Sequence, residues 1–268
     1  MPTNHPDIQK RDLTGAQKDF LEQKVLKLQA DKRIVGVAIG GSFLLDEMDE
    51  FSDLDLVLYI DDDHYPQVLD ERESIAHSMG TLLESFTGEH VGEPRLLICL
   101  YGPPLLHVDL KFVSMTDINQ KVENPVVIWE REGQISERFD STPAEFPKPD
   151  PAWIEKRFWV WVHYTATKIG RGELFEAVDA IGFLRNMVLG PLLLEKHGVR
   201  PQGLRKLEKY ISPHEREQMK STIPTYSKTG CVKALEESII LYRVLCPVDS
   251  QPAIERWSCA YLKEIKAD

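Results

Sequence analysis

The chain has few of the features that mark secreted, membrane-spanning or zinc-stabilised proteins. Its four cysteines form no C-x-x-C pair and have no neighbouring histidine cluster, so a structural zinc site is not expected. No apolar run approaches the roughly 20 residues that cross a bilayer. The polar N-terminus also has no apolar stretch of signal-peptide length. We therefore expect a cytoplasmic protein with free thiols and no membrane partner.

Positive charge is also scarce. Lys and Arg total 32 against 43 Asp and Glu, which gives a formal charge of −11. Proteins that bind DNA or RNA without sequence preference use basic patches, so we expect no nucleic-acid partner. A local basic pocket for a nucleotide remains compatible with this balance.

The pattern of apolar residues changes midway along the chain. An amphipathic helix is predicted at 14–31, and β-branched runs predict strands at 34–39, 53–60, within 95–114 and at 126–130. A proline-rich segment at 141–151 follows, and helical patterns then occupy 151–170, 173–196, a segment opened by a Ser212–Glu215 capping box, 231–245 and 252–266. We predict an α+β protein: a mixed-sheet domain over 1–145 and an all-α helical bundle over 146–268.

Two aspartates stand at the start of a predicted strand, in Asp53-Leu54-Asp55. Side chains alternate along a strand, so the two aspartates share a face and their backbones lie roughly 6.5–7 Å apart. Leu54 and the apolar residues in phase with it take the core face. Like charges on one face repel each other unless a cation lies between them. Carboxylates at this spacing suit Mg²⁺, which prefers one or two of them plus phosphate oxygens.

A third carboxylate occurs on a later strand. In the segment LLHVDLKFV, His107, Asp109 and Lys111 share one face, and Val108 and Leu110 lie on the other. If this strand lies beside the first, Asp109 joins the pair around two metal ions. Two such ions can hold the attacking and leaving oxygens of an in-line phosphoryl displacement.

The turn Gly40-Gly41-Ser42 ends the strand predicted at 34–39. Glycines let backbone N–H groups approach a phosphate closely, and the Ser42 hydroxyl adds another donor. A short helix beginning at Ser42 would also favour an anion. The turn is therefore a candidate phosphate site beside a candidate metal site.

Three features of the chain together resemble the signature of the nucleotidyltransferase superfamily, typified by DNA polymerase β and kanamycin nucleotidyltransferase. They are Gly40-Gly41-Ser42, then Asp53-Leu54-Asp55 after ten further residues, and the later Asp109. Residues 157–189 resemble, more loosely, the first two C-terminal helices of the streptomycin 6-adenylyltransferase-like and lincosamide nucleotidyltransferase-like enzymes. This second resemblance rests on Phe158-Trp159, Tyr164, Lys168, Arg171-Gly172-Glu173, Ala177 and Arg185. The acidic chain, without a helix-hairpin-helix motif or basic groove, disfavours the polymerase branch.

The resemblance, which covers about residues 30–190, implies a two-lobed, Mg²⁺-dependent enzyme. Such an enzyme would move AMP, or another nucleoside monophosphate, from ATP or another NTP to a hydroxyl of a small molecule and release pyrophosphate. An aminoglycoside or a lincosamide is the acceptor that it suggests, which would make this an antibiotic-resistance enzyme, as a monomer or homodimer. Adenylylation of a protein partner, as by an antitoxin, and a non-catalytic nucleotide-binding module are the alternatives.

The resemblance also implies roles for single residues. Asp53 and Asp55 would bind Mg²⁺, and Asp109 would either complete the metal site or take the proton of the acceptor hydroxyl. A metal-bound carboxylate is a poorer base. If Asp109 is a ligand, the base must come from elsewhere, and the candidates are Glu84, Glu176 and Asp179.

The remaining implied roles concern phosphate. Gly40, the Gly41 amide and Ser42 would bind the triphosphate, and Lys168 and Arg171 could reach its β- and γ-phosphates. Lys168 and Arg171 could equally be an ordinary basic helix end, which the helix dipole favours.

The aromatic residues of 153–164 divide by helical phase. Trp153, Phe158 and Trp161 fall near one stripe and are predicted to be core. Trp159 lies off the stripe, which makes it the better candidate for a ligand wall. Arg157 and His163 stand in the Arg-x₅-His spacing of the ribonuclease motif of helical toxins, a spacing that often arises by chance.

Overall fold

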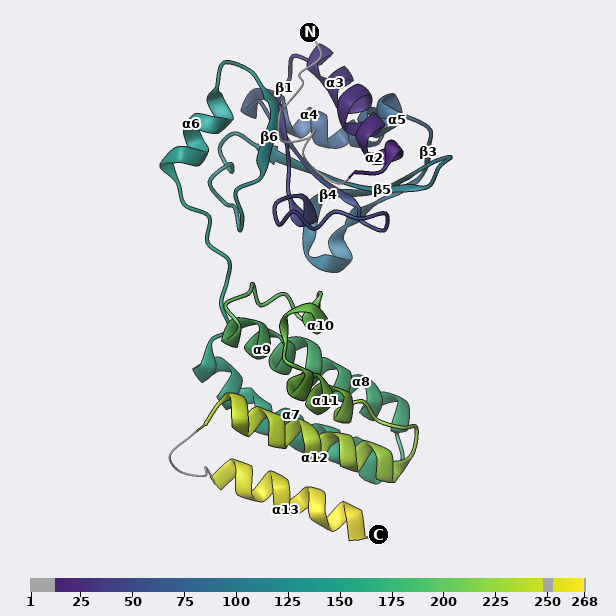
Figure 1. The fold of residues 1–268 in the computed structure, drawn as a ribbon, viewed down its shortest axis with the longest axis vertical. Coiled ribbons are helices and arrows are strands. Elements are labelled where there is room, and N and C mark those ends of the chain that lie inside the picture. Colours follow the sequence, from purple (N-terminus) through teal and green to yellow (C-terminus); the bar gives the residue numbers. More distant parts are fainter. Residues whose placement is uncertain (1–12, 248–252, 268) are drawn as a thin grey trace. The chain divides into compact units, whose positions relative to one another are not determined.

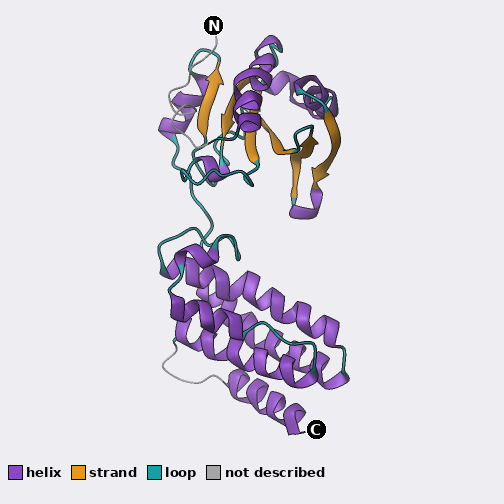
Figure 2. Cartoon of the chain, turned by 45° about the vertical axis from the view of Figure 1, so that its right-hand side comes forward, coloured by secondary structure: helices purple, strands orange, loops and turns teal. Residues whose placement is uncertain are grey.

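The computed structural model describes residues 13–247 and 253–267. The chain divides into two compact units, Met1–Phe146 and Pro147–Asp268. All strands formed by the described residues belong to the first unit, and the second consists of helices and their connections (Figures 1 and 2). The predicted α+β class, a mixed sheet followed by a helical region, is confirmed.

The first unit is built on one six-stranded sheet with the order β3-β4-β5-β2-β1-β6. The central strands β2 and β5 are parallel, and every other neighbouring pair is antiparallel. The strands are β1 (Ile34–Ile39), β2 (Leu54–Ile60), β3 (Leu82–Gly88), β4 (Glu93–Tyr101), β5 (Leu106–Ser114) and β6 (Val126–Glu130). The edge strand β3 was not predicted from the sequence.

One face of the sheet holds the main core of this unit. Leu54, Leu56 and Leu58 are almost fully buried there, as the alternation of β2 predicts. Helices cover this face (Figure 1). They are α2 (Gly15–Asp19), a π-helical turn (Phe20–Lys24), α3 (Val25–Lys27), a 3₁₀ turn (Leu28–Ala30), α4 (Tyr65–Asp70) and α5 (Arg72–Met79). Asp61 accepts a hydrogen bond from the Asp63 N–H and caps the turn before α4.

The opposite face has a smaller core. Tyr59 of β2 and Val113 of β5 pack there with Ile118 and with Ile135 of α6 (Gln134–Ser141). Because β2 and β5 alternate in phase, the same face carries Asp55 and Asp109 further toward the start of β2. The sheet therefore presents the acidic residues away from the main core.

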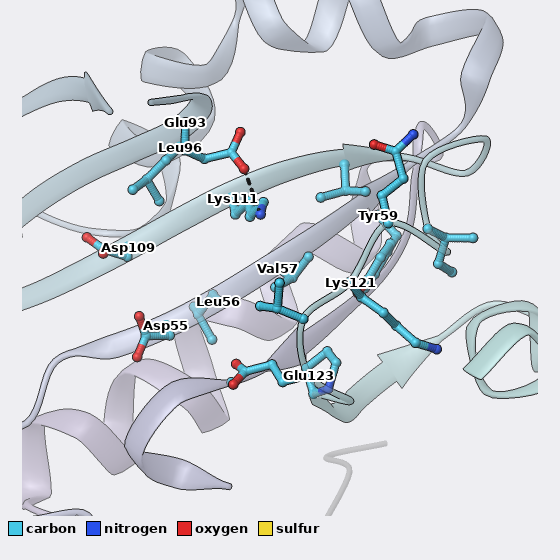
Figure 3. Close-up of a pocket in the computed structure, with 16 residues that line it drawn as sticks. Asp55, Leu56, Val57, Tyr59, Glu93, Leu96, Asp109, Lys111, Lys121 and Glu123 are labelled. Carbon is cyan, nitrogen blue, oxygen red and sulfur yellow. Dashed lines mark ion pairs between the residues drawn. The ribbon is translucent and has the colours of Figure 1, made fainter. Parts of the chain in front are cut away.

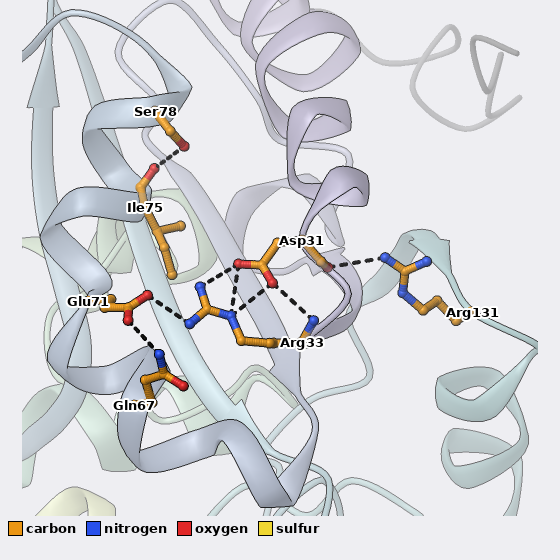
Figure 4. Close-up of polar contacts among 7 residues, drawn as sticks. All are labelled: Asp31, Arg33, Gln67, Glu71, Ile75, Ser78 and Arg131. Carbon is orange, nitrogen blue, oxygen red and sulfur yellow. Dashed lines mark hydrogen bonds and ion pairs between the residues drawn. The ribbon is translucent and has the colours of Figure 1, made fainter.

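A polar network holds the beginning of β1 in place (Figure 4). The Arg33 guanidinium donates to both carboxylate oxygens of Asp31, and its Nη1 lies 2.7 Å from Glu71 Oε2 on the connection between α4 and α5. Nη2 of Arg131 donates to the carbonyl oxygens of Gln29 and Asp31. Glu71 lies 38 positions from Arg33, and Arg131 lies 102 and 100 positions from Gln29 and Asp31. These contacts therefore join segments that are distant in sequence.

The second unit consists of helices and their connections. The helices are α7 (Pro151–Arg171), α8 (Leu174–Leu184), a π-helical turn (Arg185–Leu189), α9 (Gly190–Lys196), α10 (Leu207–Tyr210), α11 (Pro213–Ser221), α12 (Lys228–Leu245) and α13 (Ala253–Ala267). Asp150 caps α7, and Ser212 with Glu215 forms the predicted capping box of α11. The predicted helix at 252–266 corresponds to α13, although residue 252 lies outside the described part of the chain.

The prediction for Trp159 as a ligand wall was wrong. Trp159 is 2% exposed and its Nε1 donates to Glu155, whereas Trp153 is 41% exposed. The helix α7 packs against α8, α12 and α13, so its buried surface is wider than a single stripe. Arg157 and His163 take packing roles instead, stacking on Trp153 and Tyr261 respectively.

Among the described residues, one helical segment, Leu174–Lys196, is long and apolar enough to span a membrane. In its most apolar 18-residue stretch, 56% is buried inside the structure, as is usual for a helix in the core of a helical bundle. Its apolar character is therefore explained by packing against α7 and α12.

Candidate metal and triphosphate site

Three carboxylates converge on the open face of the sheet. The parallel register of β2 and β5 places Asp55 opposite Asp109, and Asp53 lies immediately before β2. One oxygen from each lies within 4.8 Å of the others, and all three residues are half-buried. Figure 3 shows Asp55 and Asp109 on neighbouring strands, at one end of a cavity.

This spacing fits a divalent cation. Two carboxylates at such a distance repel each other by about 3–4 kcal/mol at an effective dielectric constant of about 20. A cation between them removes that cost, and Mg²⁺ prefers oxygen ligands of this kind. The donor set therefore suits Mg²⁺, and the binding role of each aspartate stays a prediction.

Asp109 has a protein partner on its own strand. His107 Nε2 lies 2.9 Å from Asp109 Oδ1, and the His107 side chain is half-exposed. The two residues are two positions apart on β5 and so share a face. A carboxylate held by a neighbouring ring is oriented before any ligand arrives.

The glycine turn lies directly against Asp55. The Gly40 N–H donates to the Asp55 carbonyl oxygen at 2.8 Å, and the Gly41 N–H donates to Glu123 Oε1 at 2.9 Å. Gly41 has a φ of +59°, and a Cβ on it would lie 1.8 Å from Asp55 Oδ2. Only glycine meets both demands. Ser42 follows, buried, in a single 3₁₀ turn that begins at Gly41.

A cavity of about 240 Å³ adjoins Asp55 and Asp109. Its walls are mainly apolar and include Val57, Tyr59, Leu96, Val113, Ile118 and Pro125. Lys111 and Glu93 form an ion pair of 2.7 Å at its edge (Figure 3). Hydrogen bonds from Arg95, together with Lys111, lower the pKa of Glu93 to about 2. The cavity thus contains a fixed ion pair beside apolar surface.

Burial dominates the ionisation of two side chains in this region. Burial raises the pKa of Tyr59, and the nearby Glu123 carboxylate adds to the effect. Burial lowers the pKa of Lys121, whose Nζ lies 4.4 Å from the centre of the Phe139 ring. Tyr59 is therefore a neutral wall of the cavity at working pH.

Lys168 and Arg171 belong to the second unit, at the end of α7. Lys168 Nζ lies 2.7 Å from Glu173 and 2.9 Å from Glu176, and these hydrogen bonds raise the pKa of Lys168. The Arg171 side chain is 63% exposed, with Nη1 3.8 Å from Glu173. Lys168 is thus a cation at working pH, and the contact of Lys168 and Arg171 with phosphate stays a prediction.

The candidate bases lie in different places. Glu84 is exposed on β3, opposite Leu100, and accepts a hydrogen bond from the Ser85 N–H. Glu176 and Asp179 are on α8, and hydrogen bonds from Tyr164 and Lys168 lower the pKa of Glu176. None of these three belongs to the group of Asp53, Asp55 and Asp109.

Sequence reasoning missed Glu123, which bonds to the glycine turn. Glu123 precedes β6 in the segment QKVENPVV, which carries no recognisable motif. It is 82 positions from Gly41. Its role depends on the path of the connection from β5 to β6, which no local pattern indicates.

Part of the chain is similar to a known family. Residues 18–92 match the family described as "Nucleotidyltransferase domain". That stretch includes the glycine turn, Asp53 and Asp55, and ends before Asp109. No curated protein matches the chain significantly.

Two solved structures are similar to the chain at low identity. An aminoglycoside 6-adenyltransferase from Bacillus subtilis is 16% identical, with 93% of this chain and 99% of that chain covered and a TM-score of 0.40. A nucleotidyltransferase-like protein from Exiguobacterium sibiricum 255-15 is 14% identical, with 91% and 84% covered and a TM-score of 0.39. What the comparisons show is a likeness over residues 18–92 to a nucleotidyltransferase domain.

Proposed function

We propose that the protein moves a nucleoside monophosphate, with ATP as the first candidate donor, to a hydroxyl of a small molecule and releases pyrophosphate. The observation that carries the proposal is the convergence of Asp53, Asp55 and Asp109 next to the glycine turn, in a chain with a nucleotidyltransferase domain. A module that only bound nucleotide would not need the third carboxylate.

The proposed roles follow from what each group contacts. Asp53 and Asp55 hold Mg²⁺, which when bound neutralises charge on the triphosphate. Asp109, oriented by His107, completes the metal site or accepts the proton of the acceptor hydroxyl. The hydroxyl oxygen forms a bond to the α-phosphorus, and the bond to the leaving pyrophosphate breaks with its electron pair.

The proposed division of labour follows the two domains. The domain over 1–145 binds metal and triphosphate through its carboxylates, Gly40, Gly41 and Ser42. The domain over 146–268 contributes acceptor contacts, and Lys168 and Arg171 contact the phosphates. The cavity of about 240 Å³ beside Asp55 and Asp109 is smaller than the roughly 300–1,000 Å³ of typical ligand sites, so we propose that it holds only the part of the acceptor that carries the reacting hydroxyl. Aminoglycosides and lincosamides are the first acceptors to test.

The test is pyrophosphate release from Mg-ATP with a panel of hydroxylated acceptors. We expect turnover with at least one acceptor, loss of that turnover with EDTA, and loss in the Asp53→Asn variant. Asp63→Asn is the matched control, since Asp63 is an exposed aspartate of the same domain outside the carboxylate group. Turnover that survives Asp53→Asn would contradict the proposal. If a protein from a cell lysate gains the mass of one AMP, the acceptor is a protein and not a small molecule.

A further inference from the structure

Glu123 occupies the hydrogen-bond donor that the proposed function assigns to the triphosphate. Its Oε1 accepts from the Gly41 N–H at 2.9 Å. The same oxygen lies 2.4 Å from where a Cβ on Gly40 would be, so the missing side chain makes room for it. In Figure 3 the Glu123 carboxylate is directed toward Asp55, along the edge of the cavity.

A carboxylate oxygen and a phosphate oxygen satisfy a backbone N–H in the same way. Both are anionic acceptors, and hydrogen bonds to charged acceptors are the strong ones. One N–H directs its hydrogen at one well-aligned acceptor. A triphosphate that uses Gly41 must therefore displace Glu123, which is also repelled by the incoming negative charge.

We propose that Glu123 is an anion placeholder that leaves Gly41 when a nucleoside triphosphate binds, and so sets the affinity for the nucleotide. This inference rests on the proposed function, because it takes the glycine turn as the triphosphate site. In the nucleotide-free protein, Glu123 keeps the Gly41 N–H satisfied in a turn that is otherwise tightly packed.

Displacement of Glu123 also affects the cavity. Ile118, Val122 and Pro125 belong to the same connection between β5 and β6, and they line the cavity with Glu123. Movement of Glu123 therefore shifts one wall of the space beside Asp55 and Asp109. Nucleotide binding then changes the part of the cavity wall that Glu123 forms.

The experiment measures the Kd of a nonhydrolysable ATP analogue with Mg²⁺ by calorimetry, in the full chain. If the placeholder is in place in about nine-tenths of the molecules, it weakens binding about tenfold. We expect Glu123→Ala, which removes charge and acceptor, to bind about three- to tenfold more tightly than wild type. Glu123→Gln keeps an acceptor oxygen without the charge and should fall between the two.

Asp117→Asn is the matched control. It removes one negative charge from the same connection, but the Asp117 side chain accepts from Gln120 Nε2 at 2.8 Å and does not bond to the glycine turn. We expect its Kd to stay within about twofold of wild type, because surface charges act weakly at a distance. Thermal melting of each variant checks that it is folded, and Glu123→Gln serves if Glu123→Ala does not fold.

The outcomes separate this inference from the proposed function. Unchanged or weaker nucleotide binding in both Glu123 variants overturns the placeholder. If wild type binds no ATP analogue, the same titration uses Mg²⁺ with tripolyphosphate. Tighter tripolyphosphate binding in Glu123→Ala then supports the placeholder while the nucleotidyl-transfer proposal fails. Absence of tripolyphosphate binding in wild type and variants overturns the placeholder as well.

Discussion

Two groups of acidic side chains, one in each unit of the protein, have opposite surroundings. In the first unit, Asp53, Asp55 and Asp109 bring three carboxylates together within 4.8 Å. In the second unit, the nearly buried Glu215 lies 2.8 Å from Lys196 Nζ and 2.8 Å from His197 Nε2. Glu255, also buried, pairs with Arg243 in the same unit.

This contrast separates function from stability. Like charges held together cost folding free energy until a cation arrives, whereas opposite charges with satisfied hydrogen bonds are costly to break once they are formed. Substitutions in the carboxylate group should therefore reduce activity and spare the fold. Substitutions in the paired group should do the reverse.

The largest expected effect is on activity at Asp55. We expect Asp55→Asn to lower pyrophosphate release about a thousandfold or more, equivalent to about 4 kcal/mol of transition-state stabilisation. Without metal, its free energy of unfolding should be unchanged or slightly higher, because one like charge is removed. Urea denaturation with and without Mg²⁺ checks this: wild type should be stabilised by the ion, and the variant much less. An Asp55→Asn variant that is destabilised but still active would contradict the contrast between the carboxylate group and the paired acidic residues.

The next effect concerns the backbone that supports Asp55. Gly41→Ala places a methyl group against Asp55 Oδ2 at a φ of +59°, so we expect activity to fall about a hundredfold and stability by about 2–3 kcal/mol. Gly92→Ala is the matched control, with a φ of +76° and no atom within 4 Å of the new Cβ. It should cost about 1 kcal/mol and leave activity intact. Equal losses in both variants would mean that backbone strain alone matters at Gly41.

The sequence predicted the local features on which this contrast depends. The alternation in β2 predicts Asp55 on the face opposite Leu54, and burial confirms that face for Leu54. The cap at Asp150 and the capping box at Ser212 are signals within a few residues, and both are present. Such short-range signals are set by backbone geometry and need no knowledge of distant contacts.

What the sequence did not predict depends on contacts between distant segments. The edge strand β3 carries LLESFTG, in which apolar and polar residues do not alternate cleanly, and it is a strand because β4 pairs with it. Trp159 is buried because distant helices pack on α7. Its ring lies against Tyr242 of α12, and Ser258 Oγ of α13, about 100 residues later, donates to its carbonyl oxygen. Glu123 reaches the glycine turn only through the fold of the connection before β6.

On the stability side of the contrast, the largest effect is at Glu215. We expect Glu215→Ala to lower the free energy of unfolding by about 3 kcal/mol, because it removes a cap and leaves Lys196 and His197 without their buried partner. Its effect on pyrophosphate release, measured below the melting temperature, should be small. Glu217→Ala on the same helix is the control, since Glu217 is exposed and its side chain pairs with the exposed Lys220. A loss below about 1 kcal/mol at Glu215 would contradict the structural role.

The same residue predicts a pH dependence of stability. Although burial opposes it, hydrogen bonds from Lys196, Ser212 and His197 lower the pKa of Glu215 to about 2, from an ordinary value of 4.5. A depressed folded-state pKa gives stability that is present above pH 4.5 and lost as the pH falls toward 2. This one group contributes at most about 1.4 kcal/mol per pH unit in that window. Urea denaturation between pH 5 and pH 3 should show a shallower loss in Glu215→Gln than in wild type.

The smallest expected effect on stability, and the sharpest test of a predicted role, is at Arg171. Its side chain is 63% exposed and its carboxylate partner is 3.8 Å away, so Arg171→Ala should change the free energy of unfolding by about 0.5 kcal/mol or less. If Arg171 contacts the triphosphate, the KM for the nucleotide should rise several-fold with kcat little changed, because a binding contact shared by ground and transition states is lost. Arg205→Ala, at another exposed arginine of the same unit, should leave KM unchanged. An unchanged KM in Arg171→Ala would mean that Arg171 does not contact the nucleotide. Its positive charge would then only complement the helix dipole at the end of α7.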